Sequence, residues 1–545
     1  MQTKILKDFL WLSASIVIIF CFSRFSVFES NEALAPTILS GSVTQGKPLT
    51  VFYYTSHFLL CEIYMKLYET VKGVPWFEVF MYFYAAISLF FILKVLFIKN
   101  KSIAAQIFTL LPVLFFFSEF TLIFQYTRIA FALGIAGSLL MLSASSDIKF
   151  RKFFAATFFV VALLTRWEVG ILILLLQWLY ILCCSRSQFK NAVLWGNTLA
   201  VIILLGYVAY DRSVTTEYTK KFQPELGYQL LDRGNIIPLS SMANAVDSAK
   251  YNAVLQLISD PQYITIDFLK GLVKENAYTG FNSTLWTRCF SLLGNSAENA
   301  SGFLLIYLLL IAAVLYQQQK SNAKFFSGVT VFCLLAVVLL MAITYFLKME
   351  MRLFNSVIIF ASIILLWQIN FSAIVKQKYF FALLLIGWAA GIVLQKQIQT
   401  RYVSKLIKDA EQNTAFKNAV TQKCGNRIIV PDIQYSQNII QALFPAQMPD
   451  YAAFKNIYLF DFDVMYLEQN YNKYLREQCN CDAGDYKEMM DFFRNNKREI
   501  DFIASPERLQ VITAYCRTVR QADYRFMLKD SVDAGGIKAF VYCME

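Results

Sequence analysis

The sequence predicts a mainly α-helical protein: a polytopic bundle of about eleven transmembrane helices, followed by a small soluble α/β domain on the extracytoplasmic side. Of its 545 residues, 57% are hydrophobic and only 16% are charged, whereas soluble domains are about half apolar and about a quarter charged. The apolar residues come in long blocks of the length that crosses a bilayer. Residues 396–545 instead alternate short strand-like and helical patterns.

Apolar runs of span length define the helices of the bundle. The expected spans are residues 8–27, 76–98, 104–124, 127–145, 152–166, 168–184, 191–210, 302–317, 325–346, 353–371 and 379–395. Lys4 and Lys7 precede the first run, as in a signal peptide. No small-residue cleavage site follows it, so we interpret this run as a retained first helix.

Segment 51–72 is ambiguous, because ionisable residues such as His57 and Glu62 interrupt its aromatic side chains. This pattern suits an amphipathic helix lying in the membrane interface better than a span. With a cytoplasmic N-terminus, every inside loop then carries at least two cations, as the positive-inside rule demands. Counting the segment as a span would move the lysines at 99 and 101 outside. The net charge of +12 therefore reflects inside loops and not a nucleic-acid partner.

This topology defines two domains. Residues 1–395 form the transmembrane domain, which carries an outer loop with the interfacial helix at 26–75 and a larger outer loop at 211–301. Residues 396–545 form the soluble domain. We expect strands in "NRIIVPDI", "NIYLFDFDV", "EIDFIAS" and "GIKAFVYC", and helices in "DYKEMMDFFRNN" and "PERLQVITAYC". The outer location permits disulfides, and a single histidine in the chain argues against a histidine-rich metal site.

Arginines stand in short outer turns, where the positive-inside rule disfavours cations. The turns read "QYTR", "TRWE" and "KMEMR", and they contain Arg128, Arg166, Glu168, Glu350 and Arg352. Each arginine alone is explained by a neighbouring carboxylate or by snorkelling to lipid phosphates. Their repetition at several helix ends on one face instead indicates a site for an anionic, membrane-held substrate, because arginine offers phosphate a bidentate donor whose charge does not titrate.

Glu119 lies inside an expected span, in "LPVLFFFSEFTLIF". An ionisable side chain there is costly unless it faces the interior of the bundle. It precedes the outer turn by about nine residues, so it would lie below the site. We expect it either to pair with one of the arginines or to serve the structure alone.

The stretch "FESNEALAP" places Glu29 and Glu32 just outside the first span. The chain then continues with an interfacial helix, further spans, outer turns rich in Arg and Glu, and an outer C-terminal domain. This order resembles the GT-C superfamily of integral membrane glycosyltransferases, which includes the aminoarabinose transferases that modify lipid A and the protein mannosyltransferases. In that family an Asp-Glu pair, followed by Ala and a short helix, stands early in the first outer loop. In "NEALAPTILSG", Glu32 matches the Glu, and Asn31 replaces the Asp.

The resemblance implies transfer of a sugar from a polyprenyl-phosphate donor, with a carboxylate base for the acceptor hydroxyl and arginines for the leaving phosphate. Glu32 is the first choice for the base and Glu29 the second; alternatively, both cap a re-entrant helix. The other implied site residues are the phosphate-binding Arg128, Arg166 and Arg352, the orienting or sugar-binding Glu168 and Glu350, and His57 at the pocket entrance or merely in the interface.

The expected partners are the lipid-linked donor, membrane lipid and a lipid, glycan or protein acceptor of the cell envelope. The expected location is the bacterial cytoplasmic membrane, with the C-terminal domain outside. No cofactor is expected, and nothing supports a divalent metal. The sequence has no P-loop and no Gly-x-Gly-x-x-Gly motif. The "DFD" at 461–463 ends an expected strand, where a structural role is the simpler interpretation.

Two other functional classes share some of these features. An O-antigen or polysaccharide polymerase or ligase is also polytopic with outer arginines. Such proteins usually lack an acidic first loop and a C-terminal domain of this size, and a ligase would carry a histidine in its large loop, whereas 211–301 has none. A lipid-linked glycan transporter is less favoured, because the sequence shows neither inverted repeats nor Gly- or Pro-broken helices near the midplane.

Overall fold

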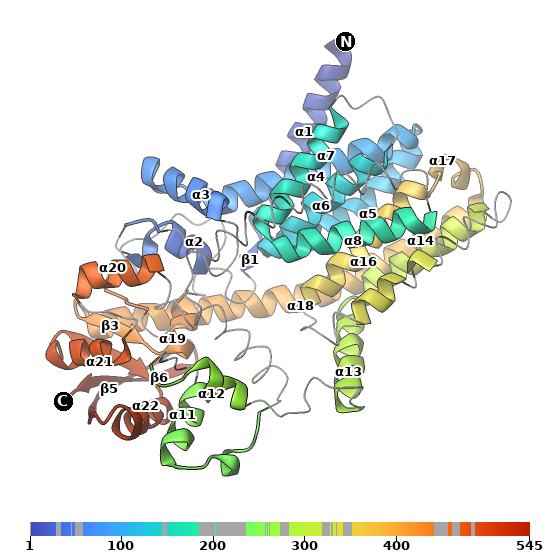
Figure 1. Ribbon diagram of the computed structural model, residues 1–545. Coiled ribbons are helices and arrows are strands. Elements are labelled where there is room, and N and C mark those ends of the chain that lie inside the picture. Colours follow the sequence, from blue (N-terminus) through green and yellow to red (C-terminus); the bar gives the residue numbers. More distant parts are fainter. Residues whose placement is uncertain are drawn as a thin grey trace. The chain divides into compact units, whose positions relative to one another are not determined.

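The computed structural model is mainly helical, with a small sheet near the C-terminus (Figure 1). It describes residues 2–28, 34–44, 46–49, 58–143, 150–184, 202, 206, 236–256, 258, 260, 262–272, 283–318, 328, 331–333, 335–341, 351–440, 456–459, 469–480 and 485–545. Contacts divide the chain into two compact units. Unit 1 comprises Met1–Glu29, Phe77–Val208 and Phe281–Leu406, and unit 2 comprises Ser30–Trp76, Ala209–Gly280 and Ile407–Glu545.

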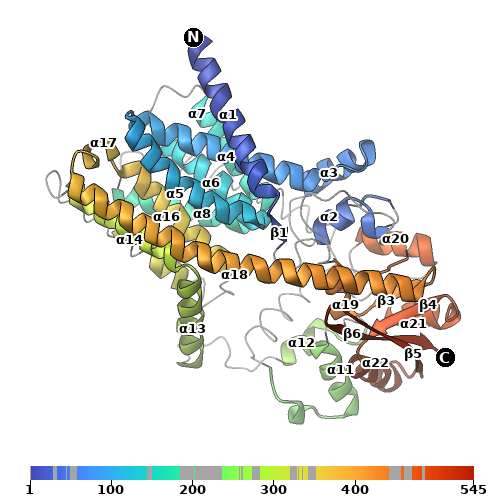
Figure 2. The same ribbon diagram turned by 180° about the vertical axis from the view of Figure 1, so that it is seen from behind.

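Unit 1 is a bundle of apolar helices (Figure 2). Its principal helices are α1 (Gln2–Ser23), α4 (Trp76–Lys99), α5 (Ile103–Leu122), α6 (Tyr126–Leu142), α7 (Arg151–Thr165), α8 (Trp167–Cys184), α13 (Ser283–Asn299), α14 (Ser301–Gln318), α16 (Met351–Gln368), α17 (Phe371–Ile374) and the first part of α18 (Lys378–Cys424). Helices are therefore confirmed at the expected spans from 8 to 184 and at 302–317, 353–371 and 379–395. The expected span 191–210 lies almost wholly outside the described residues, and 325–346 does so in part.

Within the described residues, α4, α5, α8 and α18 are long and apolar enough to cross a membrane. The adjoining pair Leu293–Asn299 and Ser301–Gln317 adds a fifth candidate if it counts as one span, although it is bent by 84°. Other expected spans are shorter as helices: α6 has 17 residues and α7 has 15, whereas about 20 residues cross a bilayer without tilt or thinning. The total of eleven spans stays a prediction.

Helix α6 is the central helix of unit 1. It packs against α7, α8 and α16, and every residue of it except Met141 is buried. Two glycines permit this close packing. A Cβ at Gly134 would lie 2.2 Å from Ile173 on α8, and one at Gly137 would lie 3.3 Å from the carbonyl oxygen of Ala155 on α7. Polar side chains in the first turn of α6 are consequently buried with it.

A two-stranded parallel pairing fixes the end of α1 beside the end of α5. Strand β1 (Val27–Phe28) pairs with β2 (Ile123–Phe124), and Phe28 is in register with Phe124. The Ser26 hydroxyl also donates to the carbonyl oxygen of Thr121. Phe28, the residue before Glu29, is therefore paired with Phe124, and Phe124 precedes Arg128 by four residues in the sequence.

Unit 2 combines short helices with one mixed sheet. Its helices are α2 (Leu34–Leu39), the 3-10 turns η2 (Ser42–Thr44) and η5 (Leu239–Ser241), α3 (Phe58–Thr70), α11 (Ala245–Leu255), α12 (Ile266–Gly271), the end of α18, α19 (Ile433–Ile440), α20 (Gln469–Cys479), α21 (Tyr486–Asn495) and α22 (Pro506–Val519). The three chain segments of this unit largely match the segments 26–75, 211–301 and 396–545 that the sequence places outside the membrane; their side of the membrane and the domain boundary at 395 stay predictions.

The sheet has the order β3-β4-β6-β5, from β3 (Ile428–Pro431), β4 (Ile500–Ala504), β5 (Phe526–Ala534) and β6 (Ile537–Met544). Strands β3 and β4 are parallel, and the others are antiparallel. Three of the four expected strands and both expected helices are confirmed. In "NIYLFDFDV" the described part gives only a bridge between Ile457 and Ile429. Strand β5 was not expected.

Helix α3 corresponds to the expected interfacial segment. Its 13 residues rise only about 20 Å, too short for a hydrocarbon core of about 30 Å. Cys61, Tyr64 and Tyr68 are buried, whereas Leu59 and Ile63 are about half exposed on its other side. These exposed apolar residues suit a helix that lies on a membrane surface.

Candidate active site

The clearest polar cluster in the described part of unit 1 centres on Glu119 of α5. Its carboxylate lies 3.0 Å from Nη1 of Arg128 on α6, and both side chains are 1% exposed. The same Arg128 nitrogen donates to the backbone carbonyl oxygen of Glu119 at 3.1 Å. The structure thus confirms the first of the two expectations for Glu119, that it pairs with one of the arginines that the sequence predicts in outer turns.

Two amides complete the surroundings of this carboxylate. Nδ2 of Asn355 on α16 donates to Oε1 of Glu119 at 2.8 Å, and Nε2 of Gln399 on α18 donates to Oε2 at 2.6 Å. A buried charge is tolerable only when it is paired and hydrogen-bonded. The four interacting side chains satisfy that condition, and they join α5, α6, α16 and α18 at one point.

Arg166 joins this cluster from the turn between α7 and α8. It caps the C-terminus of α7 in an extended conformation, and its Nη1 donates to the Tyr126 hydroxyl and, at 3.1 Å, to Oγ1 of Thr127. Its Nε lies 3.5 Å from Oε2 of Glu168 in the first turn of α8. Because Thr127 precedes Arg128, the two arginines belong to one continuous polar region.

The two arginines differ in access to solvent. The Arg166 side chain is 24% exposed and that of Glu168 is 51% exposed, whereas Arg128 is 1% exposed. Arg166 is therefore the more accessible of the two arginines to an incoming anion. For Arg128 to bind an anion, its pair with Glu119 would have to open.

Arg352 lies in the first turn of α16, three residues before Asn355, and is half-buried. It is thus on the helix end that contributes Asn355 to the cluster. The other expected site residues, Glu29, Glu32, His57 and Glu350, lie outside the described residues. Phe28 is the last described residue before Glu29, and its pairing with Phe124 brings the chain to the turn before α6.

Sequence reasoning missed several members of this cluster. Tyr126 and Thr127 directly precede Arg128 in "QYTR", so the sequence already indicated that they lie near it. Asn355 gave a usable signal, since a polar side chain within an apolar run needs a partner. Gln399 gave none, because it follows the expected end of the last span at 395.

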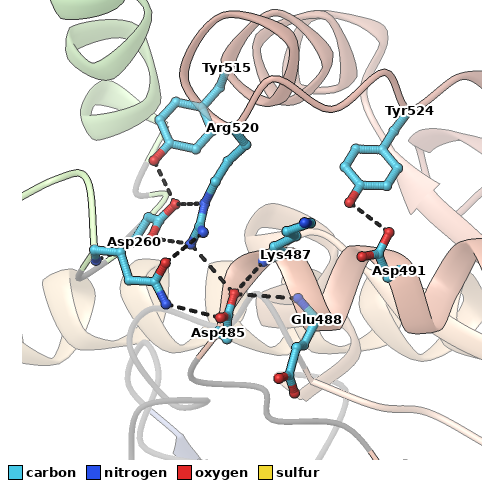
Figure 3. Close-up of polar contacts among 9 residues, drawn as sticks. Asp260, Asp485, Lys487, Glu488, Asp491, Tyr515, Arg520 and Tyr524 are labelled. Carbon is cyan, nitrogen blue, oxygen red and sulfur yellow. Dashed lines mark hydrogen bonds and ion pairs between the residues drawn. The ribbon is translucent and has the colours of Figure 1, made fainter.

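A second polar cluster lies within unit 2 and ties the segment 236–272 to the C-terminal sheet region (Figure 3). Arg520 holds the fully buried Asp260 with two bonds, Nε to Oδ2 at 2.7 Å and Nη2 to Oδ1 at 2.6 Å. The Tyr515 hydroxyl donates to Oδ2 of Asp260 at 2.7 Å, and Arg520 also lies 3.6 Å from Asp485. Burial, then the Asp260 charge, raises the pKa of Tyr515. These bonds saturate the carboxylate, which indicates a structural link.

The described residues contain no group of three His, Cys, Asp or Glu side chains arranged to hold a metal ion. The cysteines in the described part of the chain are free thiols: Cys21, Cys61, Cys183, Cys184, Cys333, Cys424, Cys479, Cys516 and Cys543. The disulfides that the expected location permits are therefore not formed among these residues.

In this polar cluster of unit 1, helix ends of an apolar bundle carry the partly exposed Arg166, the buried pair of Glu119 and Arg128, and hydroxyl groups. Such groups are suited to bind an anionic group.

Comparisons with known proteins gave two similar solved structures. No family model matches the sequence, and no curated protein matches it. The two structures are crystal structures of ArnT from Cupriavidus metallidurans, one bound to undecaprenyl phosphate and one in the apo state. Each is 12% identical to this chain, covering 98% of this chain and 97% of the other, with TM-scores of 0.41 and 0.39.

Proposed function

We propose that this protein is an integral membrane glycosyltransferase of the GT-C type. It transfers a sugar from a polyprenyl-phosphate donor to a lipid, glycan or protein acceptor of the cell envelope, at the outer face of the cytoplasmic membrane. The observation that carries the proposal is the continuous polar region of Glu119, Arg128, Thr127 and Arg166 at helix ends of an apolar bundle. The register of β1 with β2 supports it, since Phe28, which directly precedes Glu29 in the sequence, pairs with Phe124 just before the same turn.

Each residue has a defined role in the proposed reaction. Glu32, or else Glu29, takes the proton of the acceptor hydroxyl, whose oxygen forms a bond to the anomeric carbon of the sugar. The bond from that carbon to the phosphate oxygen breaks, and its electron pair leaves with the polyprenyl phosphate. Arg166 and Arg352 stabilise the charge that develops on this phosphate.

The remaining residues hold these groups in place. Glu168, 3.5 Å from Arg166, orients its guanidinium or contacts the sugar, and Glu350 does the same near Arg352. Arg128 fixes the turn through its buried pair with Glu119, and it takes part in phosphate binding only when that pair opens. His57 lines the entrance for the donor.

A transfer assay tests the proposal. Membranes with wild type, Glu32→Gln or Glu69→Gln at equal folded amounts are given radiolabelled polyprenyl-phosphate sugars and cell-envelope acceptors. Glu69 is a suitable control because it is an exposed acid, paired with Lys66 at 3.0 Å on α3. We expect transfer by the wild type and by Glu69→Gln, but not by Glu32→Gln.

Other outcomes separate the alternatives. Equal transfer by all three proteins would retain the enzyme class and move the base to Glu29 or elsewhere on the outer rim. En bloc joining of labelled glycan without transfer from any donor would overturn the proposal in favour of a polymerase or ligase. Movement of the label across the membrane alone would favour a transporter.

A further inference from the structure

Unit 1 contains a cavity of about 410 Å³ between α1, α4 and the start of α5. It does not belong to the candidate active site: Gln106 on its rim precedes Glu119 by 13 positions on the same helix, which corresponds to about 20 Å. Its volume lies in the range of small-molecule sites. The expected inside loop with lysines at 99 and 101 adjoins this end of the bundle.

One part of the cavity wall is positively charged. Nζ of Lys94 lies 2.7 Å from Oδ2 of Asp8, and the Lys94 side chain is only 19% exposed. Lys101 also lines the cavity and is exposed, and no described carboxylate forms an ion pair with it. Two cations thus face one anion, which leaves a net charge of about +1 for a ligand to neutralise.

The other part of the wall is apolar and continues into the outer surface of the bundle. Trp11 and Phe97 line the cavity and meet edge to face, with ring centroids 5.3 Å apart. Beside them, large apolar side chains point outward on both flanking helices: Phe9 and Leu10 on α1 are 63% and 59% exposed, and Ile103 on α5 is 75% exposed. Such a surface is suited to acyl chains and not to water.

We propose that this cavity binds the phosphate headgroup of an anionic phospholipid, at the end of the bundle that the sequence places in the cytoplasmic leaflet. Lys101 contacts the phosphate, Lys94 supports it from its pair with Asp8, and Trp11 and Phe97 contact the first part of an acyl chain. Basic pockets between transmembrane helices on the cytoplasmic side recognise anionic headgroups in this way. The apolar wall selects a lipid over free inorganic phosphate, which would need only the charges.

Native mass spectrometry of the full chain in detergent tests this site by counting bound phosphatidylglycerol and phosphatidylcholine. Because lipid binding is measured, failure of the proposed sugar transfer would not affect the result. Lys101→Glu reverses an exposed charge, and Gln106→Trp fills the rim without changing charge. Lys376→Glu is the matched control, since Lys376 is an exposed lysine in another expected inside loop and does not line the cavity.

We expect the wild type to bind one phosphatidylglycerol at least about tenfold more tightly than phosphatidylcholine, and Lys101→Glu to weaken this binding about tenfold. Gln106→Trp should weaken both lipids, and Lys376→Glu neither. Equal binding of the two lipids, or wild-type binding by Lys101→Glu, would overturn the proposal. So would displacement of phosphatidylglycerol by millimolar inorganic phosphate, which would mark a site for a soluble anion. If Gln106→Trp does not fold, Lys101→Glu decides alone.

Discussion

Arg128 and Glu119 form an ion pair of 3.0 Å in which each side chain is 1% exposed. The pair bridges α5 and α6 next to the turn that joins them, and Asn355 and Gln399 bond the same carboxylate from α16 and α18. The turn that carries Tyr126 and Thr127 is thereby fixed, and Arg166 is bonded to both of these residues. The buried pair thus stabilises the first turn of α6, to which Arg166 is bonded.

The buried pair of Glu119 and Arg128 should stabilise the folded protein. Arg128→Met leaves the Glu119 charge buried without its cation, so we expect a loss of about 3–5 kcal/mol in the free energy of unfolding. Chemical unfolding in mixed micelles measures this change. The double variant Glu119→Leu/Arg128→Met removes both charges and should recover much of the loss. Arg401→Met, at an exposed position of α18, is the control and should be neutral. A neutral Arg128→Met would show that the pair does not support the bundle.

Arg166 is the residue whose loss should affect chemistry more than stability, if the protein is the proposed transferase. Arg166→Gln removes a donor to the leaving phosphate, so we expect the transfer rate to fall about 100-fold, mainly in kcat. Arg166→Lys should recover little, because an ammonium group lacks the planar fork. Arg24→Gln, at an exposed arginine that directly follows α1, is the control. Wild-type kcat in Arg166→Gln would remove Arg166 from the site.

Helix positions around the site were predictable because apolar runs end at polar residues. The expected spans 76–98, 104–124 and 168–184 correspond to α4, α5 and α8 within a few residues. Strand β5 was not predictable in the same way. It is an edge strand whose sequence "FMLKDSVDA" is mostly exposed, so it lacks the buried alternation that marks a strand in a sequence.

The partners within the site depend on packing, which sequence spacing does not determine. The sequence predicted that Arg128 and Arg166 lie at helix ends. It did not predict that Arg128 is buried and Arg166 is partly exposed. That difference arises because α6 is buried along its whole length, whereas Arg166 lies in the turn after α7. Asn355 and Gln399 are more than two hundred residues from Glu119 in the sequence. They reach its carboxylate only because α16 and α18 pack beside α5.

Two arginines near the end of α22 allow a matched test in unit 2. Arg520 is 4% exposed and holds Asp260, which is 0% exposed, whereas Arg517 pairs with Asp523 at the surface, with 64% and 45% exposure. Arg520→Gln should cost about 3–5 kcal/mol, because Asp260 stays buried without its cation. Arg517→Gln should behave as wild type, since exposed pairs contribute little.

Limited proteolysis measures this difference locally. Arg520→Gln should expose new cleavage sites within residues 236–272, the segment that carries Asp260, before the rest of unit 2 is cut. Arg517→Gln should give the wild-type pattern. If the two variants are equally resistant, the Asp260–Arg520 contact does not hold the segment in place.

The reactivity of the Cys516 thiol should depend on pH in an unusual way. Burial, then the Asp260 charge, raises the pKa of its thiol from an ordinary value of 9.0 to about 12. Because the folded pKa is raised, the fold favours the protonated thiol. Its contribution to stability is therefore complete below pH 9 and is lost as the pH rises from 9 towards 12. At pH 9, about one in a thousand of the folded molecules should therefore carry Cys516 as a thiolate.

Alkylation by iodoacetamide, followed by mass spectrometry at pH 7 to 11, measures this thiolate. Cys516 should react far more slowly than the half-buried Cys543 of the same unit throughout this range. In urea both thiols should follow the ordinary dependence with a midpoint near pH 9. Reaction of Cys516 at the rate of Cys543 in the folded protein at pH 8 would show that its thiol is neither buried nor held protonated by the fold.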